Sequence, residues 1–106
     1  MKKIMLVCAS GMSTSLMVNK MQNAAATKNE EIEVFAVSEA EAQELIEQVD
    51  VIMLGPQVSY ILKDFEKAAK PHNIPVTIIA ATDYGRMNGE KVLNIGLDLI
   101  EKAKNG

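Results

Sequence analysis

The sequence predicts an α/β domain with a single open sheet of four parallel strands and helices on both faces. Four short runs are apolar and rich in Val and Ile, and helix-length segments separate them. Apolar strands without alternation are typical of a parallel sheet that is covered on both faces. We expect an open sheet with right-handed crossovers and strand order 2-1-3-4. The predicted strands are residues 3–7, 33–37, 51–54 and 76–79.

The first two helices have recognisable start signals. A Ser or Thr hydroxyl among residues 13–15 can cap a first helix, and Leu16, Met17 and Met21 follow at helical spacing. Ser38 and Glu41 form a capping box that opens a second helix, which we expect to run to about residue 48.

The last two helices are bounded by Pro and Asn. The third follows Pro56 and stops near Pro71, because proline cannot continue a helix from its interior. Its apolar positions are Tyr60, Ile61, Leu62, Phe65 and Ala69. Asn88 caps the last helix. No repeat or linker interrupts this alternation, so residues 1–106 are expected to form one domain.

The composition excludes several classes of function. A net charge of −3 and few aromatic residues argue against nucleic-acid binding. No apolar run approaches the roughly 18 residues of a membrane span, so we expect a cytoplasmic protein without membrane insertion. The single cysteine excludes an internal disulfide and a Cys-based zinc site. We expect neither a metal nor a cofactor.

The loop after the first strand has the composition of an anion-binding loop. In an open parallel sheet, ligands bind beyond the carboxyl ends of the strands. Loops 8–15, 55–57 and 80–86 lie there. The first contains only small residues apart from Met12, and Gly11 gives it conformational freedom. Backbone N–H groups at a helix start bind anions. The predicted phosphate-binding residues are Ala9, Ser10, Gly11, Met12, Ser13, Thr14 and Ser15.

Cys8 opens this loop and is the predicted nucleophile. A thiol reacts as its thiolate, which main-chain N–H groups and a helix N-terminus would stabilise. A lone free cysteine can instead be a small buried residue at a strand end. The hydroxyls have a second interpretation as well, because helix capping uses the same donors as anion binding.

The strand, Cys loop and helix also resemble the low-molecular-weight tyrosine phosphatases, whose topology we expect here. In those enzymes an Arg follows the Cys and five further residues, and this sequence has Thr14 at that position. Without the guanidinium to stabilise the transition state, hydrolysis of a phosphocysteine should be slow. A relay needs an intermediate that lasts. Asp83 could serve as a general acid, which keeps a phosphohydrolase open as an alternative, and a redox-sensing thiol is a third.

Three segments together resemble the IIB components of the lactose/cellobiose class of the bacterial sugar phosphotransferase system. They are residues 6–16, 54–58 and 83–85, and the similarity covers essentially the whole chain. The resemblance implies that Cys8 accepts a phosphoryl group from a phosphohistidine of the IIA protein. Phosphocysteine then passes the group to a sugar held by the membrane transporter IIC. The small acidic surface suggests a monomer that makes transient contacts, with the oligomeric state left open. The resemblance also leaves the sugar open, because IIC binds it.

Four residues near the carboxyl ends of the strands are candidate contacts for these partners. Met12 lies at the tip of the first loop, and Gln57 follows the third strand. The other two follow the fourth strand, on a segment that we expect to be an exposed loop. These candidates are Met12, Gln57, Tyr84 and Arg86.

Overall fold

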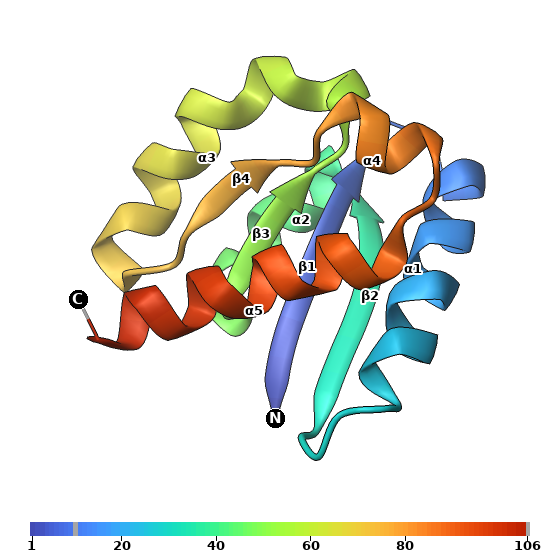
Figure 1. The fold of residues 1–106 in the computed structure, drawn as a ribbon. Helices are drawn as coiled ribbons and strands as arrows, with labels where there is room; N and C mark the ends of the chain where they lie inside the picture. The colour runs from blue at the N-terminus through green and yellow to red at the C-terminus, as the bar shows by residue number, and fades with distance from the viewer. Residues whose placement is uncertain (10, 106) are drawn as a thin grey trace.

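The computed structural model describes residues 1–9 and 11–105, without the side chains of residues 11–14. Strands and helices alternate along the chain (Figure 1). The strands are β1 (Lys2–Cys8), β2 (Ile32–Ser38), β3 (Val51–Leu54) and β4 (Val76–Ile78). The α-helices are α1 (Gly11–Ala25), α2 (Glu39–Leu45), α3 (Leu62–Ala69), α4 (Ala81–Gly85) and α5 (Gly89–Asn105). Short 3₁₀ helices are η1 (Ile46–Gln48), η2 (Pro56–Ile61) and η3 (Lys70–His72).

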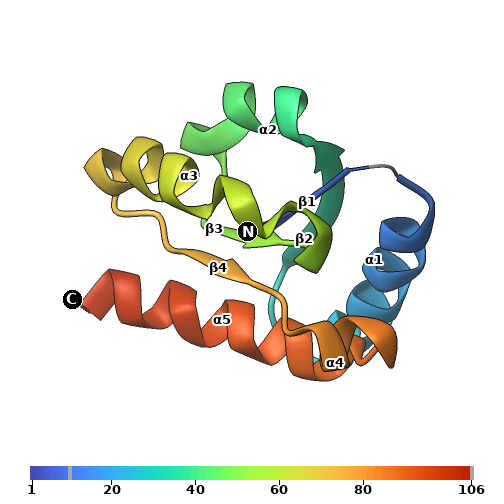
Figure 2. The same cartoon turned by 90° about the horizontal axis from the view of Figure 1, so that it is seen from above.

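The four strands form one parallel sheet in the order β2-β1-β3-β4. Figure 2 looks down on the carboxyl ends of the strands, with α2 and α3 on one face and α1, α4 and α5 on the other. The predicted fold class and strand order are confirmed. All four strands match the predicted segments to within one residue at each end.

Both faces of the sheet are buried in separate cores. Ile4 and Leu6 of β1 point into the core beneath α1 and α5, whereas Met5 and Val7 point into the core beneath α2 and α3. All four side chains are at most 1% exposed. Burying one such side chain stabilises the fold by about 1.5–3 kcal/mol, so β1 contributes strongly along its whole length. This two-sided burial is the reason that the strands are apolar without alternation.

Two of the predicted helix starts are confirmed. Ser38 caps α2, where its Oγ accepts a hydrogen bond from the Glu41 N–H at 3.4 Å and the Glu41 carboxylate accepts one from the Ser38 N–H at 3.4 Å. Asn88 precedes α5, and its Oδ1 accepts from the Lys91 N–H at 3.3 Å. These bonds satisfy N–H groups that have no partner within the helix.

The first helix begins earlier than predicted. It starts at Gly11, so residues 13–15 lie in its first turn rather than before it. First-turn N–H groups make no intrahelical bond, and Gly, Ser and Thr are all tolerated there. Composition therefore does not define the start. The predicted loop contact Ser10 lies outside the described residues.

The predicted third helix is divided into three parts. It starts as η2, continues as α3 and ends in η3, which contains Pro71. Val58 breaks the helical geometry with φ −118° and ψ 25°. Because of this change of helix type, Tyr60 is 75% exposed and does not join the apolar face predicted for it. The segment expected to be a loop after β4 also differs, since it contains the short helix α4.

Gln22 of α1 covers the outer edge of the sheet at β2. Its side-chain amide donates to the Ile32 carbonyl at 3.2 Å and accepts from the Val34 N–H at 2.7 Å. An uncovered strand edge invites pairing with another chain. The side chain therefore occupies main-chain groups that would otherwise be open at this edge. No helix in the described part of the chain is long and apolar enough to cross a membrane.

Helices α1 and α5 lie in close contact at Gly89. A Cβ on Gly89 would lie 2.5 Å from the Lys20 Cβ and 2.6 Å from the Lys20 carbonyl carbon. Backbone atoms cannot move away from such a contact without shifting a helix. A Cβ on Gly85 would meet nothing within 4 Å.

We predict that Gly89→Ala lowers the free energy of unfolding by about 1–3 kcal/mol, the usual cost of overpacking. The matched control Gly85→Ala should be neutral or stabilising by up to about 1 kcal/mol, because alanine favours helix. Urea unfolding followed by circular dichroism measures both. Equal stability of the two variants would contradict the close approach of α1 and α5.

Lys2 joins the start of β1 to two carboxylates. Its Nζ lies 2.6 Å from Glu30 Oε2 and 3.2 Å from Glu101 Oε1. The hydrogen bond to Glu30 raises the pKa of Lys2 above its ordinary value of 10.5, although burial acts against it. The same bond lowers the pKa of Glu30 below its ordinary value of 4.5.

We predict that Lys2→Met lowers the free energy of unfolding most between pH 4.5 and pH 10.5, which are the ordinary pKa values of Glu30 and Lys2. Glu30 has a lowered pKa, so its contribution is present above pH 4.5 and is lost as the pH falls through the folded-state value. Lys2 has a raised pKa, so its contribution is present below pH 10.5 and is lost as the pH rises through the folded-state value. Urea midpoints of both proteins across this range test it. A difference that stays constant from acid to alkali would rule out the ion pairs as its source.

Candidate functional site

The carboxyl edge of the sheet brings Cys8 together with the ends of its neighbours. Cys8 is the last residue of β1 and is paired with Ser38 at the end of β2. On the other side, the Gly55 N–H after β3 donates to the Val7 carbonyl at 2.9 Å. Helix α1 starts only three residues after Cys8. The thiol thus lies where an open parallel sheet places its ligand.

Cys8 is buried, and the residue lines part of a cavity. Its side chain is 4% exposed, and the thiol donates to the Val37 carbonyl at 3.6 Å. Only the protonated thiol can make this bond, so ionisation must break it. The adjoining cavity has a volume of about 410 Å³. It is lined by Cys8, Ala9, Ser38, Glu39, Ala40, Gln43, Val58 and Tyr60.

Helix α1 points its N-terminus toward the end of β1. It is 15 residues long, and its first N–H groups have no intrahelical partners. The helix therefore presents hydrogen-bond donors and partial positive charge beside Cys8, as anion sites at helix starts do. The predicted contacts Met12, Ser13 and Thr14 have side chains outside the described residues. Ser15 is exposed.

Gln57 also reaches this edge of the sheet. Its Oε1 lies 3.0 Å from the position that a Cβ would occupy on Gly55, and the Val7 carbonyl lies 3.3 Å from the same point. The side chain is thus folded over the turn that follows β3, beside β1. Glycine at position 55 leaves room for both groups. Gln57 is exposed, and its role as a partner contact stays a prediction.

The segment after β4 differs from the prediction. Tyr84 was expected on an exposed loop, but it is 7% exposed and packs in the core beneath α1 and α5. Helix α4 turns the ring inward, so the fold leaves little of Tyr84 for a partner to touch. Arg86 is exposed just after α4, where it can still meet a partner.

Asp83 lies on α4 and is tied to α5. Its side chain is 8% exposed, and Oδ1 lies 3.2 Å from the Nζ of Lys91, whose side chain is 58% exposed. An ion pair holds this carboxylate toward α5. That geometry suits a link between α4 and α5 rather than the general acid considered for a phosphohydrolase.

Most residues of the cavity wall were not predicted as functional, Glu39 and Tyr60 among them. Glu39 starts α2, and the sequence predicted only the capping box of Ser38 and Glu41 for this segment. Tyr60 was assigned to the apolar face of a regular helix. An aromatic residue soon after a Gly-Pro turn could have indicated the exposed position, because such turns often begin with 3₁₀ geometry.

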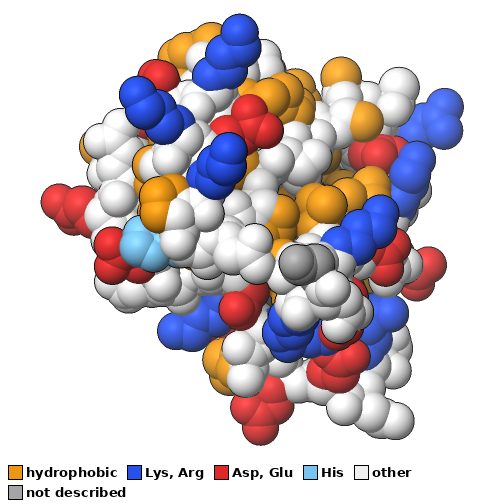
Figure 3. Space-filling model, turned by 90° about the vertical axis from the view of Figure 1, so that its left-hand side faces the viewer, with side chains coloured by type: hydrophobic (Ala, Val, Ile, Leu, Met, Phe, Trp, Pro, Cys, Tyr) orange, Lys and Arg blue, Asp and Glu red, His pale blue; other side chains and the backbone are white. Residues whose placement is uncertain are grey.

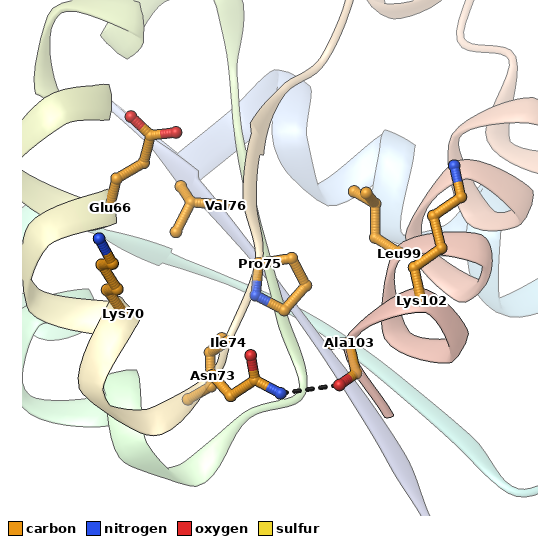
Figure 4. Close-up of a pocket in the computed structure, with 9 residues that line it drawn as sticks. All are labelled: Glu66, Lys70, Asn73, Ile74, Pro75, Val76, Leu99, Lys102 and Ala103. Carbon is orange, nitrogen blue, oxygen red and sulfur yellow. Dashed lines mark hydrogen bonds between the residues drawn. The ribbon is translucent and has the colours of Figure 1, made fainter. Parts of the chain in front are cut away.

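A larger cavity lies far from Cys8, near the amino end of β4. It has a volume of about 460 Å³ and lies between α3 and α5, where Asn73 Nδ2 donates to the Ala103 carbonyl at 2.7 Å (Figure 4). The molecular face drawn in Figure 3 mixes lysines, carboxylates and apolar side chains. This cavity and Cys8 lie at opposite ends of the parallel strands.

The fold and the position of Cys8 together define a small α/β protein with a thiol just before a helix start. Residues 3–95 match the family model described as the lactose/cellobiose-specific IIB subunit of the phosphotransferase system. The chain belongs to this family. It is a phosphocarrier of the lactose/cellobiose class, acts in phosphoryl transfer to sugar, and as such interacts with IIA and IIC components.

Three similar proteins cover nearly the whole chain. The oligo-beta-mannoside-specific EIIB component of Bacillus subtilis is 41% identical over 94% of this chain and 97% of its own. The galactose-specific EIIB component of Lactococcus lactis is 43% identical over 93% and 96%. The solution structure of the cellobiose-specific IIB component of Borrelia burgdorferi has a TM-score of 0.80 at 38% identity and covers 96% and 94%.

We predict that Asp83 and Lys91 are energetically coupled. Removing the buried carboxylate with Asp83→Ala should cost more than Lys91→Ala, because Lys91 is largely solvated. A double-mutant cycle by urea unfolding should give a coupling free energy of about 0.5–1 kcal/mol. Strict additivity of the two substitutions would show that the ion pair does not hold α4 to α5.

Proposed function

We propose that Cys8 is the residue that carries the phosphoryl group. The observation that carries the proposal is the position of Cys8, which lines a cavity and lies three residues before the N-terminus of α1. Cys8 is also the only cysteine in the sequence. A thiolate is the strongest nucleophile that a protein side chain offers near neutral pH. A helix start beside it can stabilise both the thiolate before the transfer and the phosphoryl group after it.

The reaction then proceeds in two displacements at phosphorus. The Cys8 thiol first leaves the Val37 carbonyl and loses its proton. The thiolate attacks the phosphorus of a phosphohistidine on IIA, a sulfur–phosphorus bond forms, and the nitrogen–phosphorus bond breaks with its electron pair returning to the imidazole. In the second step a sugar hydroxyl bound by IIC attacks phosphocysteine, loses its proton and releases the thiolate.

The α1 start holds the phosphoryl group between these steps. Successive N–H groups of loop residues 9–15 would donate to its oxygens, and hydroxyls of the same loop would add donors. Thr14 stands where the tyrosine phosphatases have Arg, so the loop lacks the guanidinium that would speed attack by water. A slowly hydrolysed phosphocysteine can wait for IIC.

The three relatives are named for different sugars, namely oligo-beta-mannoside, galactose and cellobiose. In the proposed scheme IIC binds the sugar, so the choice among these lies with the transporter. We expect the carrier to work in the cytoplasm as a monomer that meets IIA and IIC in turn.

We predict that phosphoenolpyruvate, the general phosphotransferase proteins and a cognate IIA add one phosphoryl group to the protein. Intact mass spectrometry and peptide mapping should place it on Cys8. Cys8→Ser should abolish the acid-stable thiophosphate adduct and sugar phosphorylation while leaving the urea midpoint nearly unchanged.

Two results would contradict this proposal. A phosphoryl group on any other residue, or none in a mixture whose IIA is phosphorylated, would remove Cys8 from the pathway. Rapid turnover of an aryl phosphate by the protein alone would instead favour a phosphohydrolase.

A further inference from the structure

Glu39 is the only charged residue among the described residues that line the same cavity as Cys8. It is the first residue of α2 and is half-buried. A site that is to hold an anionic phosphoryl group therefore has a carboxylate on its wall.

The sulfur of Cys8 lies on the side of β1 that faces this carboxylate residue. The thiol donates to the Val37 carbonyl at 3.6 Å, and Cys8 is paired with Ser38 at the end of β2. Glu39 follows Ser38 directly in the sequence. Because consecutive Cα atoms are about 3.8 Å apart, the Glu39 Cα lies within roughly 10 Å of the sulfur.

Glu39 differs from the other carboxylate in the first turn of α2. Glu41 accepts hydrogen bonds from the Ser38 Oγ at 3.0 Å and from the Ser38 N–H at 3.4 Å, so its carboxylate is held in the capping box. The Glu39 side chain makes no hydrogen bond or ion pair within residues 1–9 and 11–105. Its position does not serve the helix cap.

No cationic side chain comes from the segments that border the cavity. Residues 8–15, 37–45 and 55–61 contain no Lys, Arg or His. Arg86 and Lys91 follow α4 and lie on α5, and Figure 2 shows both helices on the face of the sheet opposite to α2. The charge of Glu39 is therefore not balanced by a neighbouring cation of these segments.

This charge acts against a phosphoryl group on Cys8. Such a group carries a charge of about −1.5 to −2 at neutral pH. At an ionic strength of about 0.1 M the Debye length is about 10 Å, so the repulsion between the two anions is only partly screened. Repulsion raises the free energy of phosphocysteine relative to that of the free thiol. The N–H groups at the start of α1 act in the opposite direction.

We propose that Glu39 lowers the stability of phosphocysteine and so favours onward transfer of the phosphoryl group to the sugar hydroxyl. The proposal rests on the proposed role of Cys8. Glu39 acts through space and forms no bond in either displacement. Its effect should therefore appear in the equilibrium between phosphorylated IIA and the carrier, whatever the rate at which that equilibrium is reached.

The equilibrium constant for transfer from phosphorylated IIA to the carrier tests this proposal. The two proteins are mixed without IIC, and intact mass spectrometry gives the phosphorylated fraction of each. Glu39→Gln should raise the constant about three- to tenfold at about 0.1 M ionic strength. Glu39→Asp keeps the charge and should stay within twofold of the wild type. At about 1 M, where the Debye length is about 3 Å, the effect of Glu39→Gln should fall below twofold.

Glu44→Gln is the matched control, because Glu44 is an exposed residue of the same helix and does not line the cavity. It should leave the constant within twofold of the wild type, and urea midpoints should show that each variant is folded. The proposal is overturned if Glu39→Gln changes the constant less than twofold, lowers it, or has the same effect as Glu44→Gln. A shift that persists undiminished at high salt also overturns it. A wild type that takes no phosphoryl group on Cys8 from phosphorylated IIA rejects the role of Cys8, and this role of Glu39 with it.

Discussion

The structure depends on β1, a central strand that is buried on both faces. Its side chains enter both cores alternately, and its main chain pairs with β2 on one side and β3 on the other. The strand that is held most firmly therefore ends in the candidate nucleophile. A sulfur atom at the end of such a strand has a well-defined position, which an in-line displacement requires. The neighbouring elements α1, α2 and η2 are placed around it by the same two cores.

Main-chain groups contribute to the polar chemistry of the described part of the site. Helix α1 supplies its N-terminal N–H groups, and Val37 supplies the carbonyl that holds the neutral thiol. The loop sequence offers no Lys, Arg or His among residues 8–15. A site built this way can accept and release an anionic group without the strong fixed positive charge that favours hydrolysis. This is the balance that a carrier requires.

Most of the fold could be predicted from the sequence because the helix caps and apolar strands agree with the overall alternation of strands and helices. Apolar strands, the Ser38–Glu41 capping box and the Asn88 cap each report one element, and the structure confirms them. It could not predict the division of the third helix, because 3₁₀ and α-helical turns share the same residue preferences. The exposed position of Tyr60 depends on that division. Tyr84 was misplaced for the converse reason, since a short helix after β4 turned it into the core.

The amide of Gln22 has an effect beyond the edge that it covers. By holding the Ile32 carbonyl and the Val34 N–H, it sets how far α1 is advanced along β2 and how the helix is rotated about its axis. The opening turn of the same helix lies eleven residues earlier, soon after the end of β1. A rigid helix transmits that alignment along its length, so one glutamine at the rim of the sheet helps to position the start of α1 near the end of β1.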